Sequence, residues 1–122
     1  NFGKLAEYAT AMYPGAVITE IDREDNGYFE VEFLHNRKRK EMTFDTNSKW
    51  VSTKWDVNRS ELPDAVINQL QKSHAGWRID DAEYVETPAA RWYDIELEKA
   101  GIDIHALDFR REIFQLQSRV FG

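Results

Sequence analysis

The start of the chain carries apolar side chains at the spacing of an amphipathic helix. In residues 2–15 these side chains recur at steps of three and four positions: Leu5, Tyr8, Ala9 and Met12. A Pro-Gly pair follows directly, and both residues interrupt a helix. The pattern therefore predicts one short helix that ends before Pro14.

A second helical pattern occupies residues 60–76. Ser60 is a candidate N-cap, Pro63 falls in the first turn, where proline is tolerated, and Gly76 ends the pattern. The apolar stripe of this segment consists of Leu62, Val66 and Leu70. We expect a second helix that begins at Ser60.

After each helix the hydrophobic period changes from 3.6 to 2, which is typical of half-buried strands. The regular stretches are residues 28–34, 40–45, 50–57, 92–97 and 111–120. Their alternation assigns these side chains to the inner face: Phe29, Val31, Phe33, Met42, Phe44, Val51, Thr53, Trp55, Val57, Tyr93, Ile95, Leu97, Phe114, Leu116 and Val120. Residues 102–109 allow two registers, one with Ile102 and Ile104 inward and one with Leu107 and Phe109 inward.

The chain therefore repeats one plan twice, a helix followed by four antiparallel strands. Matching positions carry similar residues, such as Gly15 and Gly76. Strands with one apolar and one polar face form a sheet that is covered on one side, and the helices supply the cover. The predicted fold class is α+β, with two tandem α-β4 repeats, residues 1–58 and 59–122, in one compact unit whose helices pack on one face of the sheet.

Composition restricts the partners of the chain. It has 22 acidic and 16 basic residues, a net charge of −6 and a pI near 5.1, which disfavours nucleic acids and anionic membranes because their phosphates attract a positive surface. It contains no cysteine, so disulfides and thiolate nucleophiles are excluded. No apolar run approaches the roughly 18 residues of a membrane-spanning helix. We expect a protein that does not span a membrane and stays monomeric, or one that meets a basic partner.

The candidate contact residues are those whose side chains point to the outer, polar face of the predicted strands. Three aromatic side chains fall there, namely Tyr28, Trp50 and Trp92. Their charged neighbours on the same predicted face are Glu30, Glu32, Lys54, Asp94 and Glu96. Exposed Tyr and Trp bury a large area at a small cost in rotamer freedom, so they favour a protein interface. Cross-strand pairing that only stabilises the sheet is the alternative interpretation.

The residues do not predict an enzyme. The three histidines, His35, His74 and His105, lie in no nucleophile motif and at no zinc-ligand spacing. Outward carboxylates at two-residue spacing share a face, as a glycosidase requires of its pair, but exposed strands often carry acids simply for solubility. We therefore assign no catalytic residue, no metal ligand and no cofactor.

Two loops suggest other functions. The stretch "DTNSK", residues 45–49, begins with the D-x-N spacing of a calcium loop, but later oxygen ligands are missing and the same residues make tight hairpin turns. A small-ligand or calcium-responsive sensor is the alternative function. The basic run "RKRK", residues 37–40, could indicate nucleic-acid binding. In an acidic chain we interpret it as a solvated hairpin tip.

Several stretches resemble the PepSY-like family of small bacterial periplasmic proteins, which is also described as beta-lactamase-inhibitor-like for its fold. They are "PGAVITEIDRE", "NGYFEVEF", "FDTNSKWVSTKWDV", "LPDAVINQL", "IDDAEYVETP" and "WYDIELE". The resemblance runs over nearly the whole chain, and it is specific for membership but not for activity. In the second half, "LEKAGIDIHALDFRREIFQLQ" lacks the hairpin pattern of residues 44–49, so binding residues transfer less directly there.

The resemblance carries expectations about location and function. It implies a periplasmic or secreted protein, with a signal peptide removed upstream, and one curved sheet made by both repeats. In the relative of this fold that inhibits beta-lactamase, the concave sheet face holds the enzyme. We therefore predict a non-enzymatic, inhibitor-like or protein-binding module that contacts a periplasmic protein or peptide through its open sheet face.

Overall fold

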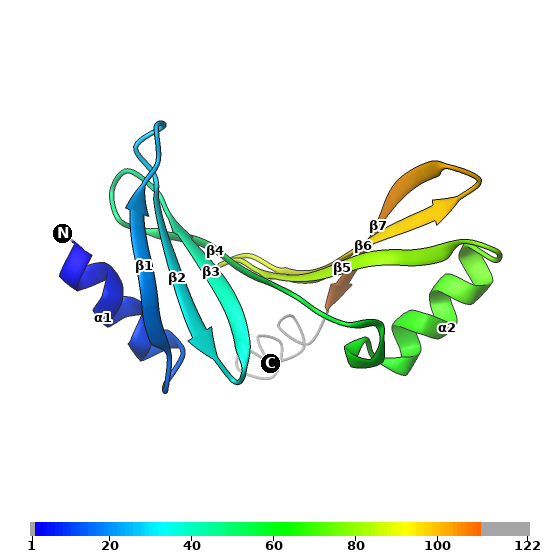
Figure 1. Cartoon of the computed structure of the whole chain (residues 1–122), viewed down its shortest axis with the longest axis horizontal. Helices are drawn as coiled ribbons and strands as arrows, with labels where there is room; N and C mark the ends of the chain where they lie inside the picture. Colours follow the sequence, from blue (N-terminus) through cyan, green and yellow to red (C-terminus); the bar gives the residue numbers. More distant parts are fainter. Residues whose placement is uncertain (1, 111–122) are drawn as a thin grey trace, which may run out of the picture. The chain divides into compact units, whose positions relative to one another are not determined.

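The computed structural model describes residues 2–110 of the chain. Within this range the elements are α1 (Phe2–Met12), β1 (Val17–Arg23), β2 (Phe29–His35), β3 (Lys38–Phe44), β4 (Trp50–Asp56), the 3₁₀ helix η1 (Arg59–Glu61), α2 (Asp64–Ser73), β5 (Arg78–Glu86), β6 (Arg91–Lys99) and β7 (Ile102–Arg110). The strands are ordered in the sheet as they are in the sequence, which gives a seven-stranded sheet. Strands β1 to β4 pair antiparallel in turn, as do β6 and β7, so the fold is α+β (Figure 1).

The contacts divide the chain into two compact units. The first runs through Asp56 and takes in Glu86–Pro88, and the second begins at Val57. The first unit therefore contains α1 and β1 to β4, and the second contains η1, α2 and nearly all of β5 to β7. The last strand predicted for the second half, with its inner-face residues, lies outside the described residues.

In the first unit, α1 covers the apolar face of the strands (Figure 1). The buried core of this unit consists of Leu5, Ala9, Tyr13, Val31, Phe33, Met42 and Phe44. The predicted alternation of β2 and β3 is therefore confirmed. Tyr8, predicted in the helix stripe, is about half exposed and makes an edge contact with the ring of Phe44.

The core of the second unit joins α2 to β5 and β6. Its buried members are Leu62, Val66, Ala82, Ile95 and Leu97, which confirms the predicted inward phase of residues 92–97. In β7 the register with Leu107 and Phe109 inward is wrong, and of the other register only Ile104 lies inward, because Ile102 is 60% exposed. Ile104 and Ala106 pack on this core, while Leu107 and Phe109 point to solvent.

The second helix starts later than its sequence pattern predicts. Residues 59–61 form η1 instead, in which the backbone N–H of Asn58 donates to Glu61 Oε1 at 2.8 Å. Leu62 is extended, and α2 begins only after Pro63, so the prediction of Ser60 as its N-cap is wrong. The cause is Pro63, because a residue before proline is disfavoured in the helical region of backbone conformation.

A β-bulge reverses the predicted phase at the start of β4. Thr43 pairs with Ser52 but Phe44 pairs with Trp50, which leaves Val51 as the extra residue. Trp50 therefore lies on the core side, packed against the buried cluster, while Val51 is 36% exposed. The predictions that Trp50 points outward and that Val51 points inward are both wrong.

The basic run also departs from its predicted place. The β2–β3 hairpin turns at Asn36 and Arg37, whose φ angles of 53° and 63° suit a two-residue hairpin turn. Lys40 already belongs to β3, points to the core side and is only 6% exposed. The interpretation of residues 37–40 as a solvated tip is therefore wrong for Lys40.

Candidate partner-binding face

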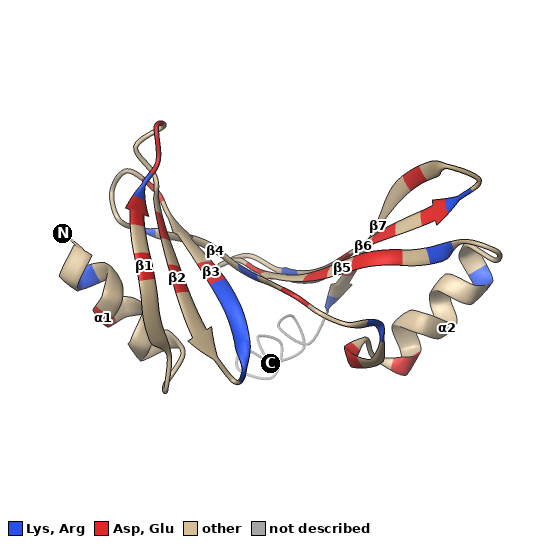
Figure 2. Cartoon of the chain, viewed as in Figure 1, with Lys and Arg blue, Asp and Glu red and all other residues tan. Residues whose placement is uncertain are grey.

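The open face of the first unit is strongly acidic. The register places Glu20 opposite Glu32, and Asp22 opposite Glu30, on the neighbouring strands β1 and β2. Figure 2 shows that both strands carry acidic positions. On the next strand Glu41 lies opposite Glu32. The predicted residues Glu30 and Glu32 thus lie together within a row of carboxylates.

Lys54, on β4, is the predicted cation of this face, and its Nζ lies 3.8 Å from a Glu41 carboxylate oxygen. Tyr28 lies in the turn just before β2, where its backbone N–H donates to Asn26 Oδ1 at 2.9 Å. Its side chain is half-buried. The structure therefore brings Lys54 next to the acidic row and places Tyr28 at the entrance to β2.

Crowding of like charges changes the acidity of this face. Burial raises the pKa of Glu30 to about 7, and hydrogen bonds and charge repulsion from Glu24 and Glu41 add to this effect. The charge of Asp22 and its hydrogen bond are the first causes that raise the pKa of Glu20. The face therefore retains protons near neutral pH that isolated carboxylic acids would release.

We expect Glu30→Gln to stabilise the chain at pH 8 more than at pH 5. The folded-state pKa of Glu30 is raised, so its favourable contribution is present below about pH 4.5 and is lost as the pH rises through about 7. A neutral amide removes the repulsion and still donates hydrogen bonds to neighbouring carboxylates. Because the face is open to solvent, the gain at pH 8 should stay below about 1 kcal/mol.

Urea unfolding at the two pH values measures this difference. Glu7→Gln, on the exposed surface of α1, is the matched control for the replacement of a carboxylate by an amide. An equal effect of Glu30→Gln at pH 5 and pH 8 would contradict the raised pKa.

The open face of the second unit carries a small aromatic and aliphatic cluster. The rings of Trp92 and Phe109 are 5.2 Å apart between centroids and lie opposite each other on β6 and β7. Phe109 is 51% exposed, and Leu107, two residues earlier on the same face, is 53% exposed. We call these three residues the Trp92 cluster. Of its members, sequence reasoning selected only Trp92.

Charged groups of β6 and β7 border the Trp92 cluster. His105 Nδ1 lies 2.7 Å from Asp94 Oδ1, and His105 Nε2 lies 3.6 Å from Glu96 Oε2. A hydrogen bond and the charge of Asp94 raise the pKa of His105 above its usual value. Burial is the first cause that raises the pKa of Glu96. The predicted pair Asp94 and Glu96 is thus held around a histidine that sequence reasoning did not place there.

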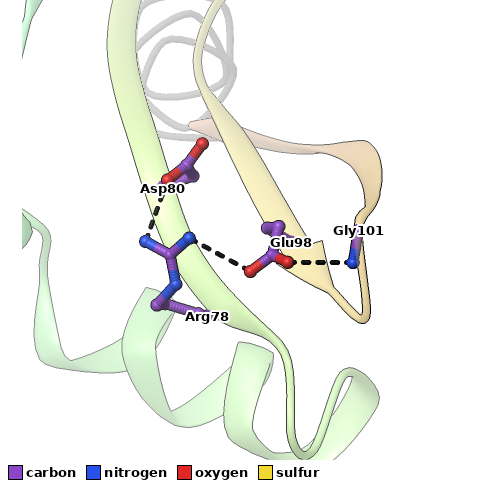
Figure 3. A network of polar contacts seen from close by, with 4 residues as sticks. All are labelled: Arg78, Asp80, Glu98 and Gly101. Carbon is purple, nitrogen blue, oxygen red and sulfur yellow. Dashed lines mark hydrogen bonds and ion pairs between the residues drawn. The ribbon is translucent and has the colours of Figure 1, made fainter.

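A polar network continues this face toward the β6–β7 turn (Figure 3). Arg78 donates to Asp80 at 2.9 Å and to Glu98 at 3.0 Å, and Glu98 accepts from the backbone N–H of Gly101 at 3.1 Å. The carboxylates of Asp80, Glu96 and Asp103 approach within 4.8 Å of one another. Exposed acidic groups are often this close without an ion, so the trio alone does not define a metal site.

The calcium-like turn is explained by its own hydrogen bonds. Asp45 Oδ1 accepts from the backbone N–H groups of Asn47 and Lys49 at 2.8 and 2.9 Å. Ser48, with a φ of 62°, completes the turn. A carboxylate engaged in this way closes a hairpin, as Asp and Asn commonly do.

The remaining histidines have structural surroundings. His35 Nε2 lies 3.2 Å from the carbonyl of Pro14, and its Nδ1 accepts from Lys40. His74 Nδ1 lies 2.7 Å from Ser73 Oγ, but that hydroxyl also donates to the carbonyl of Gln69, as helical serines often do. None of the described histidines thus forms the nucleophile, base and acid series of a hydrolase.

Known proteins resemble this chain in sequence and in fold. The family model "Putative beta-lactamase-inhibitor-like, PepSY-like" matches residues 27–111. The chain belongs to the PepSY-like family. Comparison with curated proteins finds no match.

Solved structures share the fold of this PepSY-like chain. A BLIP-like protein from Bacteroides fragilis is 22% identical, with a TM-score of 0.72 over 88% of this chain and 84% of its own. A DUF2874 family protein from Bacteroides ovatus is 24% identical, with a TM-score of 0.70 over 86% of this chain and 77% of its own. A "putative periplasmic" protein from Bacteroides eggerthii is 22% identical, with a TM-score of 0.67 over 84% of this chain and 77% of its own. These likenesses establish a BLIP-like fold.

The PepSY-like chain contains no helix, among residues 2–110, with the length and hydrophobicity needed to cross a membrane. The family is described as inhibitor-like rather than by a catalysed reaction. The open faces of the strands are therefore the candidate binding surfaces.

Proposed function

We propose that this chain is a non-enzymatic periplasmic module that binds a protein partner through its open sheet face. The Trp92 cluster carries the proposal. Leu107 and Phe109 are each more than half exposed beside Trp92, which leaves a continuous apolar patch in water. Aromatic residues surrounded by charged groups are typical of the energetic centre of an interface.

The polar border favours a partner with basic groups. Asp94 and Glu96 lie beside the cluster. The open face of the first unit, taken by itself, is also acidic and carries Glu30 and Glu32. A cation from a partner would relieve the charge repulsion from Glu24 and Glu41 that adds to the effect of burial on the pKa of Glu30. We propose Tyr28 and Lys54 as further contacts on that face. Trp50 is not included, because it packs against the core.

Location and repeat structure belong to the same proposal. The periplasmic assignment is supported by the description of the Bacteroides eggerthii relative. We also propose that residues 59–122 repeat the α-β4 plan of residues 1–58. The shared order of helix and strands, α1 with β1 to β3 and α2 with β5 to β7, supports this.

Site-specific photocrosslinking tests the interface. We expect a crosslinking amino acid at position 109 to trap one abundant periplasmic protein, whereas the same amino acid at position 8 on α1 should not. Both positions carry an exposed aromatic residue in the natural chain, so they are a matched pair.

The trapped partner, once purified, is measured by calorimetry against variants. Leu107→Ser with Phe109→Ser should weaken its binding at least tenfold, about 1.4 kcal/mol. Tyr8→Ser should leave binding unchanged. Equal trapping at positions 8 and 109, or undiminished binding by the double variant, would show that the Trp92 cluster only pairs the strands.

A further inference from the structure

The second unit contains a cleft beside α2. It has a volume of about 380 Å³ and lies between the C-terminal half of α2 and the start of β5. Its apolar lining consists of Ile67, Leu70, Trp77, Ile79 and Leu97. Apolar clefts of about 300–1,000 Å³ with a few polar groups are typical of small-molecule sites.

The charge of this cleft is opposite to that of the chain. Its ionisable lining residues are Arg59, His74 and Arg78, and no carboxylate lines it among the described residues. The chain as a whole carries a net charge of −6. A cleft with an apolar floor and only basic ionisable groups complements an anion that carries an apolar body.

The two arginines differ in what they can offer such a ligand. The guanidinium of Arg78 is already held by Asp80 and Glu98 at 2.9 and 3.0 Å (Figure 3). Arg59 forms no hydrogen bond or ion pair with any side chain of residues 2–110. It also lines a smaller pocket of about 180 Å³ that includes Asp80 and Asp81. Arg59 is therefore the cation with an uncommitted guanidinium.

The position of Arg59 is fixed by its own short helix. It is the first residue of η1, which is closed by the Asn58–Glu61 hydrogen bond and by the Leu62 N–H donating to the Arg59 carbonyl at 3.1 Å. The backbone that carries the guanidinium is thus ordered before any ligand arrives. A planar guanidinium binds a carboxylate with two parallel hydrogen bonds.

We propose that this cleft binds a small amphipathic carboxylate. The alkyl or aryl body lies on the apolar floor formed by α2, β5 and β6, and the carboxylate binds Arg59. The volume lies near the lower end of the usual range, which restricts the ligand to a single alkyl chain of medium length or one ring system. This site is independent of the Trp92 cluster and does not rest on the proposed partner binding.

NMR titration of the ¹⁵N-labelled chain with dodecanoate and with indole-3-acetate tests the site. The indole N–H of Trp77 reports directly from the cleft. We expect saturable shifts of this signal below the micelle concentration of dodecanoate. Dodecyltrimethylammonium, which has the same tail and the opposite charge, should not produce them.

Variants separate the two parts of the site. Arg59→Gln should weaken carboxylate binding at least fivefold, whereas Arg39→Gln, an exposed arginine of β3, should not change it. Ala75→Phe should fill the mouth of the cleft and abolish binding with the fold intact by circular dichroism. Binding of only one of the two carboxylates supports the site and identifies its body as alkyl or aryl. Absence of saturable shifts, equal binding of the ammonium compound, or an unchanged affinity in Arg59→Gln would overturn the proposal.

Discussion

Trp50→Ala is expected to lower the free energy of unfolding by about 3 kcal/mol. The indole packs on the core of the first unit, opposite Phe44, and its Nε1 donates to the fully buried hydroxyl of Thr53 at 2.9 Å. Truncation leaves a cavity and removes a partner of that hydroxyl. Aromatic-to-alanine changes in cores cost about 3–5 kcal/mol, and the partial exposure of Trp50 places it at the lower end. Urea unfolding followed by circular dichroism measures the loss.

Trp92→Ala is the matched comparison, because it removes the same atoms from the open face. It loses the ring contact with Phe109 at 5.2 Å, for which we expect about 1 kcal/mol. The difference between the two variants therefore compares a tryptophan packed on the core with one on an open sheet face. Equal losses in both variants would contradict the placement of Trp50 in the core.

The bulge explains why sequence reasoning succeeded on β2 and failed on β4. Along β2 strict alternation puts Val31 and Phe33 in the core, and β2 itself carries no extra residue. The irregularity of the β1–β2 ladder lies on β1, between Ile18 and Glu20. At the start of β4, Val51 is an additional residue that the period of two cannot reveal. Its position depends on which residue of β3 lies opposite. That is a property of pairing between strands and not of either segment alone.

The same limit applies to the candidate site. Trp92, Asp94 and Glu96 could be placed on one face because β6 alternates regularly. The exposed residues Leu107 and Phe109 could not be placed in this way, because residues 102–109 carry apolar side chains on both faces of the strand. Ile104 and Ala106 reach the core, and this decides the phase of β7. The sequence did show two apolar residues on one face of this strand, at positions 107 and 109. Whether that face points to the core or to solvent depends on how β7 packs against α2 and β6.

Lys40→Ala is expected to lower the free energy of unfolding by about 3 kcal/mol. The ammonium lies 3.9 Å from the centre of the Trp55 ring and 3.0 Å from His35 Nδ1, in a side chain that is 6% exposed. The charge of Glu86 is nearby, and Glu86 in turn accepts from the Tyr13 hydroxyl at 2.7 Å. Removing this long side chain takes away its packing on Trp55 and its hydrogen bond to His35, and core truncations to alanine of this size cost about 2–5 kcal/mol.

Lys40→Met separates the packing of this side chain from its charge. The thioether keeps most of the apolar stem against Trp55 and Tyr13, so we expect a loss of about 1–2 kcal/mol, in the range of a cation–π contact and one hydrogen bond. Lys54→Met, at a half-exposed lysine of the open face, is the control and should cost less than about 0.5 kcal/mol. A similar loss for both lysines would contradict a buried role for Lys40.

The pH dependence distinguishes a buried ammonium from a merely well-packed side chain. Burial lowers the pKa of Lys40 below its usual value of 10.5, so between the folded and the unfolded pKa the unfolded chain binds more protons. The contribution of Lys40 to stability therefore rises as the pH approaches 10.5. The loss caused by Lys40→Met should grow between pH 7 and pH 10. Urea unfolding at both pH values tests this, and a constant difference between wild type and Lys40→Met would show that the lysine keeps an ordinary pKa in the folded chain.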